Sequence, residues 1–213
     1  MKVDKDKQPL ISIDVVPVRF DKATGVLQVG TGRRLFDPFV GEQALPGVLL
    51  MQGESIEHAA YRALNSKTGI LAEHSGYITQ LGAFDGTNRD PRGATISIAL
   101  LSAQEFGRSP STRVLWTPVA DATGLPFDHD AIVRGALSRI AQSLWVDAEM
   151  MKMLLGKKFS TSDAIELSKA TGAWPTDASN FGRWLSSNKN VKKLDAPSAS
   201  TGRGRPSAVW TWA

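Results

Sequence analysis

Metal-assisted chemistry on a diphosphate depends on carboxylates, and the stretch from Leu45 to Ile70, LPGVLLMQGESIEHAAYRALNSKTGI, contains a predicted helix that could carry them. Mg²⁺ and Mn²⁺ are hard cations that bind several carboxylate oxygens, and helical residues three and four apart share one face. That face here holds Ala63, Ser66 and Lys67. These side chains cannot bind a divalent cation, and Lys67 would repel one by about 1 to 4 kcal/mol at contact distance. The sequence therefore predicts no metal site and no catalytic residue.

The same stretch resembles the Nudix box of diphosphate hydrolases, whose pattern is G-x5-E-x7-R-E-U-x-E-E-x-G-U with U a bulky aliphatic residue. The positions that keep the pattern are Glu54, Arg62, Leu64, Gly69 and Ile70, and those that depart from it are Val48, Ala63, Ser66 and Lys67. The resemblance implies a retained fold and a lost reaction, with weak residual hydrolase activity left open. Two alternatives are a chance similarity over 26 residues and an active enzyme with relocated ligands, for which Glu54, Glu57 and Glu73 are available.

Two arginine-bearing loops flank the box. Arg33 and Arg34 lie in TGRRLFDPF before it, and Arg89, Asp90 and Arg92 lie in FDGTNRDPRG after it. Guanidinium groups bind phosphates bidentately, so two such loops around one cleft could hold a diphosphate without a metal. The alternative is that these arginines are surface or ion-paired residues, with Asp90 pairing to Arg89 or Arg92. The predicted effector-binding residues are Arg33, Arg34, Phe36, Glu54, Arg62, Arg89, Asp90 and Arg92.

Composition excludes several classes of protein. The 213 residues include no cysteine, which removes disulfides, thiolate zinc sites and cysteine nucleophiles. The histidines are only His58, His74 and His129, too scattered for a metal cage. No run approaches the roughly 20 apolar residues of a membrane span, and the start MKVDKDKQPL lacks a signal-peptide core, so we expect a cytoplasmic protein with no membrane partner. Neither pattern nor composition calls for a cofactor.

Charge divides the chain in two. Residues 1–150 carry 15 Lys/Arg against 17 Asp/Glu, whereas residues 151–213 carry 10 against 4. A slightly acidic body followed by a small basic unit is typical of a protein whose second part meets a polyanion. We predict a first domain over residues 1–147 and a second over 148–213.

The first domain should be built from strands around one long helix. Apolar β-branched runs predict strands at 11–20, 25–29, 77–84, 95–102 and 114–119, and periodicity predicts a helix over 56–68 with Ser55 as its N-cap and Gly69 at its end. A second helix should run to about Ser143, with Asp128 as N-cap and Phe127 packed on Ile132. His129 is read as a helix-start residue and not as a ligand.

The second domain has the element order of a winged helix-turn-helix. Three helices are expected. The first ends at Gly156, the second runs from Ser160 or Thr161 to Gly172, and the third starts at Thr176 or Asp177. Two strands should follow, near residues 190–194 and 207–212. Such a module places its last helix in the major groove and its wing on the DNA backbone. The predicted DNA-binding residues are Thr176, Ser179, Asn180, Arg183, Lys189, Lys192, Lys193, Arg203 and Arg205. The alternatives are a winged domain used for protein contacts and a minor-groove arm at Arg203 to Pro206.

In this order, the degenerate box, the RDPRG loop, the FDH helix start and the C-terminal GRPSAVWTW resemble the Nudix-related NrtR regulators of NAD metabolism. The resemblance implies an α+β fold, a Nudix α/β/α sandwich with a mixed sheet followed by a winged helix-turn-helix. It implies a homodimeric repressor that senses ADP-ribose or a related NAD-derived nucleotide and binds a double-stranded DNA operator. Val48 and the DAPSAST insert depart from the family pattern. The competing interpretations are an ADP-ribose or dinucleotide pyrophosphatase with an accessory domain, and a nucleotide-sensing interaction protein without DNA.

Overall fold

The computed structural model describes residues 8–86, 88–107, 111–172, 178–197 and 207–213. Its larger sheet has seven strands in the order β3-β2-β1-β6-β5, with β4 paired to β1 and β7 paired to β2. The strands are β1 (Leu10–Asp21), β2 (Val26–Arg33), β3 (Gln43–Ala44), β4 (Gly47–Leu49), β5 (Tyr77–Phe84), β6 (Thr95–Gln104) and β7 (Leu115–Pro118). Because β1 pairs parallel with β6 and antiparallel with β2, the sheet is mixed, and the predicted fold class is confirmed.

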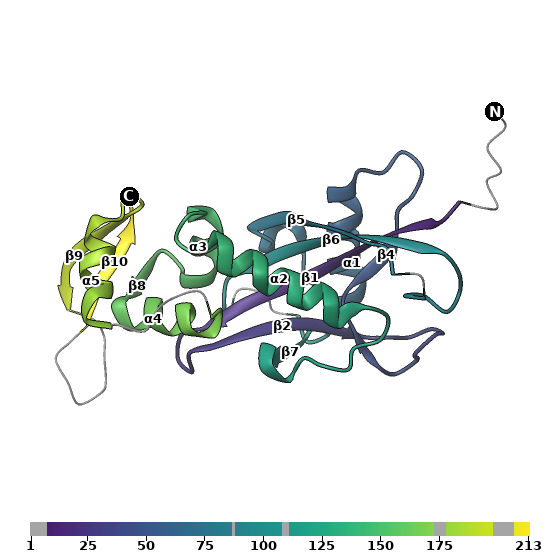
Figure 1. The fold of residues 1–213 in the computed structure, drawn as a ribbon, viewed down its shortest axis with the longest axis horizontal. Helices are drawn as coiled ribbons and strands as arrows, with labels where there is room; N and C mark the ends of the chain where they lie inside the picture. The colour runs from purple at the N-terminus through teal and green to yellow at the C-terminus, as the bar shows by residue number, and fades with distance from the viewer. Residues whose placement is uncertain (1–7, 87, 108–110, 173–177, 198–206) are drawn as a thin grey trace.

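Strand β1 lies in the middle of the sheet, and its side chains pack into the apolar cores on both faces. Ile13 and Val15 belong to the core under α1 (Ile56–Thr68), while Val16, Val18 and Phe20 belong to the core under α2 (His129–Ser143). This alternation follows the period of two along a strand. The sheet therefore lies between two helices, and Figure 1 shows α2 crossing its near side.

Helix α1 has the predicted bounds. The side chain of Ser55 accepts a hydrogen bond from the His58 N–H, and Gly69 ends the helix in the left-handed region at φ 72°. A glycine is favoured there because it has no Cβ to clash. Short 3-10 turns follow at η2 (Ala72–His74) and, before α2, at η3 (Val119–Asp121).

The start of α2 differs from the prediction. Asp128 occupies the N-cap position but its side chain caps no backbone N–H, because it accepts hydrogen bonds from Arg89 instead. Phe127, expected on Ile132, has φ 62° and its ring contacts Phe39 and His129.

The C-terminal unit contains α3 (Ala148–Leu155), α4 (Thr161–Ala170), α5 (Ala178–Ser187) and a sheet ordered β8-β10-β9. Its strands are β8 (Lys158–Ser160), β9 (Val191–Pro197) and β10 (Ala208–Trp212). Ser160 and Asp163 form a reciprocal capping box at the start of α4, as the Ser-x-x-acid spacing favours. Strand β8, which no alternating pattern marks, was not predicted.

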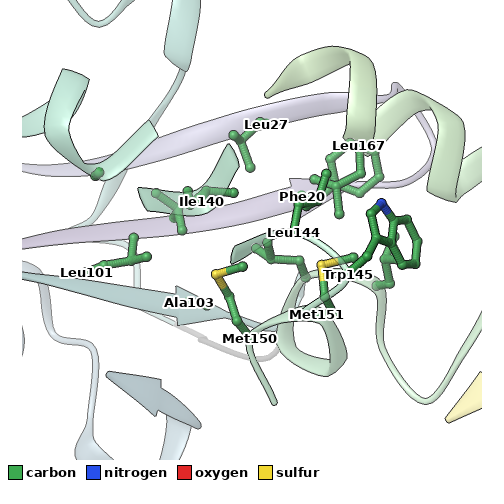
Figure 2. Close-up of a cluster of buried hydrophobic side chains, with 14 of the residues drawn as sticks. Phe20, Leu27, Leu101, Ala103, Ile140, Leu144, Trp145, Met150, Met151 and Leu167 are labelled. Atoms are coloured by element: carbon green, nitrogen blue, oxygen red, sulfur yellow. The ribbon is translucent and has the colours of Figure 1, made fainter. Parts of the chain in front are cut away.

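One apolar core joins the two predicted domains. Met150, Met151 and Leu154 of α3 are buried in the same cluster as Phe20 and Leu101 of the large sheet, as Figure 2 shows in part. That cluster continues into the C-terminal unit through Phe159, Leu167, Phe181 and Trp210. The C-terminal unit is therefore packed onto the sheet through α3. Among the helices that the structure describes, none is long and apolar enough to cross a bilayer.

Candidate functional site

The α1 face that would carry metal ligands is neutral or cationic. Ala63 is fully buried, while Ser66 and Lys67 are exposed near the end of the helix. Arg113 adds a second cation there, donating to the carbonyl oxygens of Asn65 at 3.0 Å and Ser66 at 3.4 Å. Within the described residues no three acidic, histidine or cysteine side chains gather as a metal ion would require. This face offers no ligand set for a hard divalent cation.

Glu54 and Arg62, the retained box residues, bind each other. Arg62 donates from Nε and a terminal nitrogen to the two carboxylate oxygens of Glu54, both at 2.7 Å, and also to the Leu49 carbonyl at 2.8 Å. The hydrogen bond from Arg62 is the main cause that lowers the pKa of Glu54 to about 2. The pair therefore ties the end of β4 to α1, a structural role that needs no metal.

A cluster of cations and aromatic rings lies just before the start of α2. The guanidinium carbons of Arg34 and Arg92 lie 4.8 and 5.8 Å from the centre of the Phe127 ring, and Phe39 packs edge-on against that ring at 5.0 Å. We call Arg34, Arg92 and Phe127 the arginine cluster. It brings together the two loops that were predicted from the sequence to share a cleft.

The charges in the arginine cluster are unequally matched. Arg92 forms a two-point ion pair with Asp90, whose side chain is 5 % exposed, whereas Arg34 donates to the uncharged carbonyl oxygens of Pro38 at 2.6 Å and Phe36 at 3.2 Å. Burial and then the charge of Arg92 lower the pKa of Arg34, while the charges of Asp90, Asp14 and Asp37 oppose them. An anion placed between these guanidiniums would relieve their repulsion and could accept from the terminal N–H groups that these bonds leave over.

Arg89 lies beneath the cluster in a buried ionic network. Its side chain is 3 % exposed and pairs with Asp128 at 2.8 Å and Asp14 at 3.2 Å, and Ser12 and Ser97 also donate to Asp14. Burial lowers the pKa of Arg89, but the hydrogen bonds and charges of Asp128 and Asp14 outweigh it and raise the pKa above its ordinary value. Arg89 is therefore fully engaged inside the protein and supports the loop that carries Arg92.

His129 completes this network as a neutral imidazole. Its Nδ1 accepts the Leu45 N–H at 3.1 Å, which leaves the ring proton on Nε2, 3.9 Å from the Asp14 carboxylate. Burial, the largest influence, lowers the pKa of His129. The residue fixes the loop before the box and is the helix-start residue that was predicted.

The predicted effector-binding residues thus fall into three groups. Four converge at or under the arginine cluster, namely Arg34, Arg89, Asp90 and Arg92. Glu54 and Arg62 form their own pair, while the Arg33 guanidinium donates to the Gly41 carbonyl and Phe36 is 73 % exposed. Sequence reasoning missed the ring of Phe127 as part of the site, because a residue preceding an N-cap is ordinarily read as a packing contact.

The predicted DNA-binding residues that the structure describes lie on α5 and β9. Phe181 and Leu185 are buried, which leaves Asn180 and Arg183 exposed on the other side of α5, where Arg183 donates to Asn180. Lys189, Lys192 and Lys193 are exposed in the turn and strand that follow. Thr176, Arg203 and Arg205 lie outside the described residues, as does the side chain of Ser179. The described part of this surface is cationic and free of acids except Asp195.

Comparison with known proteins agrees with this architecture. No protein-family model matches the chain. It is 26% identical to an ADP-ribose pyrophosphatase of Methanocaldococcus jannaschii over 130 residues, 59% of this chain and 72% of that protein. It is 30% identical over 141 residues to an ADPR-responsive transcriptional repressor, NtrR, of Acinetobacter baylyi, 62% of this chain and 54% of that protein, so the match spans about half of the repressor.

The fold extends over nearly the whole chain. Shewanella oneidensis NrtR, crystallised with a 27mer DNA, matches with a TM-score of 0.77 at 23% identity, covering 95% of this chain and 93% of that one. The chain is therefore similar to NrtR in both its sheet domain and its C-terminal unit, and the predicted resemblance is confirmed for the fold.

Proposed function

We propose that this chain is a DNA-binding transcriptional repressor whose Nudix-like part binds ADP-ribose or a related NAD-derived nucleotide without cutting it. The observation that carries the proposal is the arrangement of charge. The helix face where the box would place metal ligands has Ala63, Ser66 and Lys67, while the guanidiniums of Arg34 and Arg92 share the Phe127 ring just before α2. Such a site can hold a diphosphate but has no means of recruiting the ion that would activate water.

The C-terminal unit supports the second half of the proposal. Its α5 and β9 present Arg183, Lys189, Lys192 and Lys193 to solvent, as backbone contacts with a duplex require. Shewanella oneidensis NrtR, crystallised with DNA, shares the fold of both units, and the ADPR-responsive repressor of A. baylyi is similar over 62% of this chain. We propose a homodimer, because two half-sites about one helical turn apart need two such helices.

In this proposal the winged C-terminal unit can take more than one position relative to the sheet domain. Nucleotide binding then lowers the population of the position that fits DNA. The coupling is reciprocal, so DNA weakens nucleotide binding by the same factor, typically equivalent to about 1 to 3 kcal/mol. Calorimetric titration with ADP-ribose, NAD and nicotinamide mononucleotide tests the sensor, since the proposal expects saturable binding of ADP-ribose in the absence of any divalent cation. Heats no larger than those of dilution for all three ligands would contradict it.

An ADP-ribose pyrophosphatase is the second candidate, favoured by the similarity to the M. jannaschii enzyme. The assay that separates the two measures AMP released from ADP-ribose with Mg²⁺ or Mn²⁺. The repressor proposal expects release at the level of a protein-free control. Metal-dependent turnover that is lost in Glu57→Gln or Glu73→Gln would establish relocated ligands and favour the hydrolase.

A further inference from the structure

The residues just before α2 connect the arginine cluster to a buried ion pair. The Phe127 ring lies under Arg34 and Arg92, and the next residue, Asp128, accepts hydrogen bonds from Arg89 at 2.8 and 3.0 Å. Phe127 has φ 62°, a conformation that costs an ordinary residue about 1 to 3 kcal/mol and persists only where the surroundings fix it. The Phe127 ring and the Asp128 carboxylate therefore join three arginines to the residue that begins α2.

Helix α2 is a rigid connection away from this point. It runs without a break from His129 to Ser143, about 22 Å at 1.5 Å per residue. Ile132, Ala136 and Ile140 are buried on the sheet along its length. A helix packed along one face moves as a body, so a displacement at its first turn reaches its last.

The far end of α2 enters the core of the C-terminal unit. Trp145, two residues after the helix, also has a left-handed backbone, at φ 67°, and is 6 % exposed. Its indole N–H donates to Ser168 of α4 at 3.2 Å, and its ring lies 5.6 Å from those of Phe181 and Trp184 of α5. Trp145 therefore contacts the helix that supports the proposed recognition surface.

We propose that Phe127, Asp128, α2 and Trp145 form a mechanical link that converts occupancy of the arginine cluster into a change in the placement of α5. The inference rests on the proposed function for the identity of the ligand. Trp145 acts as a positioning residue, since it touches neither the arginine cluster nor the exposed face of α5.

Cysteine labelling tests the link, because the chain has no cysteine of its own. Spin labels at the exposed positions Gln80→Cys on β5 and Ser186→Cys on α5 report the distance between the two units by pulsed electron resonance. Doubly labelled protein diluted into unlabelled protein should change its distance distribution when ADP-ribose is added. Trp145→Phe, which keeps a ring but loses the Ser168 bond, should reduce that change by at least half.

Trp210→Phe is the matched control. Trp210 is 2 % exposed and donates its indole N–H to Thr161 at 2.8 Å, a bond of the same kind that lies wholly inside the C-terminal unit. The control should keep the ADP-ribose response. An equal response in both variants, or binding of ADP-ribose with no change in the parent protein, would overturn the link.

Hydrogen exchange tests the link without any ligand. Its outcome therefore does not depend on whether the protein binds ADP-ribose. Asp128→Asn weakens the pair with Arg89, whereas Asp130→Asn, in the same first turn, removes one of the two oxygens that accept from the Gly124 and Leu125 N–H groups. At matched global stability, amides 164–168 should exchange at least fivefold faster in Asp128→Asn than in Asp130→Asn. Phe127→Leu, which leaves the ion pair intact, should give the same result if Asp128→Asn folds poorly. Equal exchange in all variants would refute the link, while absent ADP-ribose binding would refute only the ligand.

Discussion

Arg34 is the residue whose charge has most to gain from an anionic ligand, because its bonds go to carbonyl oxygens and a second guanidinium stands nearby. Arg34→Gln should weaken ADP-ribose binding about 10- to 100-fold, since a hydrogen bond to a charged group contributes about 1.5 to 3 kcal/mol. Calorimetry measures the change. Arg113→Gln, which removes an exposed guanidinium from the end of α1, is the matched control and should bind as the parent does.

The burial of His129 predicts that the folded protein loses stability in mild acid. Burial lowers its pKa in the folded protein below the ordinary 6.5, so below that pH the unfolded chain takes up a proton that the folded chain excludes. Stability from this group is complete above pH 6.5 and falls as the pH decreases, by at most about 1.4 kcal/mol per pH unit. Urea unfolding at several pH values between 7 and 5 gives the slope of unfolding free energy against pH. This slope should be smaller in His129→Gln and unchanged in His58→Gln, which replaces an exposed side chain. Identical slopes in the two variants would contradict the assignment.

The wing and α5 are expected to act on DNA through charge. Removing Arg183 and Lys192 together should lower the slope of log K against log salt by about 1.8, because each phosphate contact contributes about 0.9. Binding to a duplex of mixed sequence, titrated at several salt concentrations, gives this slope without knowledge of the operator, and retardation of a specific site should be lost. ADP-ribose affinity should stay unchanged.

The control for that experiment changes the same amount of charge on neighbouring helices. Lys152 and Lys169 each pair with a glutamate three residues earlier, on α3 and α4. Lys152→Ala with Lys169→Ala should leave the salt slope within experimental error of the parent. A slope reduced equally in both double variants would remove α5 and β9 as the binding surface.

Local signals explain which elements were predictable. The bounds of α1 follow from Ser55 and Gly69, both of which act within four residues of their partners, and the capping box of α4 follows from Ser160 and Asp163. The role of Asp128 could not be read in the same way, because its partner Arg89 is 39 residues away in the sequence. Strands β3 and β4 are two and three residues long, too short for alternation to appear.

Only part of the arginine cluster could be predicted, because residue type is a local signal and burial is not. Arg34 and Arg92 could be named because arginines in loops beside strands suit phosphate, and the structure brings them to one ring. The burial of Arg89 was not accessible, since its environment is assembled from β1, the loop at 89 and the start of α2. Residue type indicates chemistry, but only long-range packing decides which arginine faces solvent.

The apolar core that joins the two units is the feature least visible in the sequence. Charge changes sign near residue 150, which suggested a boundary at 147, yet α3 buries Met150, Met151 and Leu154 on the large sheet. Tyr77 also donates to Asp147 at 2.6 Å, and Lys22 to the carbonyl of Leu155 at 3.0 Å. The sheet domain therefore needs α3 to cover its apolar end, and the full chain should unfold in one cooperative transition.

Two fragments test how the core is shared. A fragment ending at Gly156 keeps α3, whereas one ending at Asp147 leaves Phe20 and Leu101 without the side chains that cover them. Because burying one such side chain contributes about 1.5 to 3 kcal/mol, the shorter fragment should have a lower urea midpoint and bind a hydrophobic dye that the longer one excludes. In the full chain, tryptophan fluorescence, to which Trp116 of the sheet and the five tryptophans from Trp145 onward all contribute, should change at the same urea concentration as the far-ultraviolet circular dichroism. Equal midpoints for the two fragments, or two separate transitions in the full chain, would show that the C-terminal unit is only tethered to the sheet, and a tethered unit could not be moved by α2.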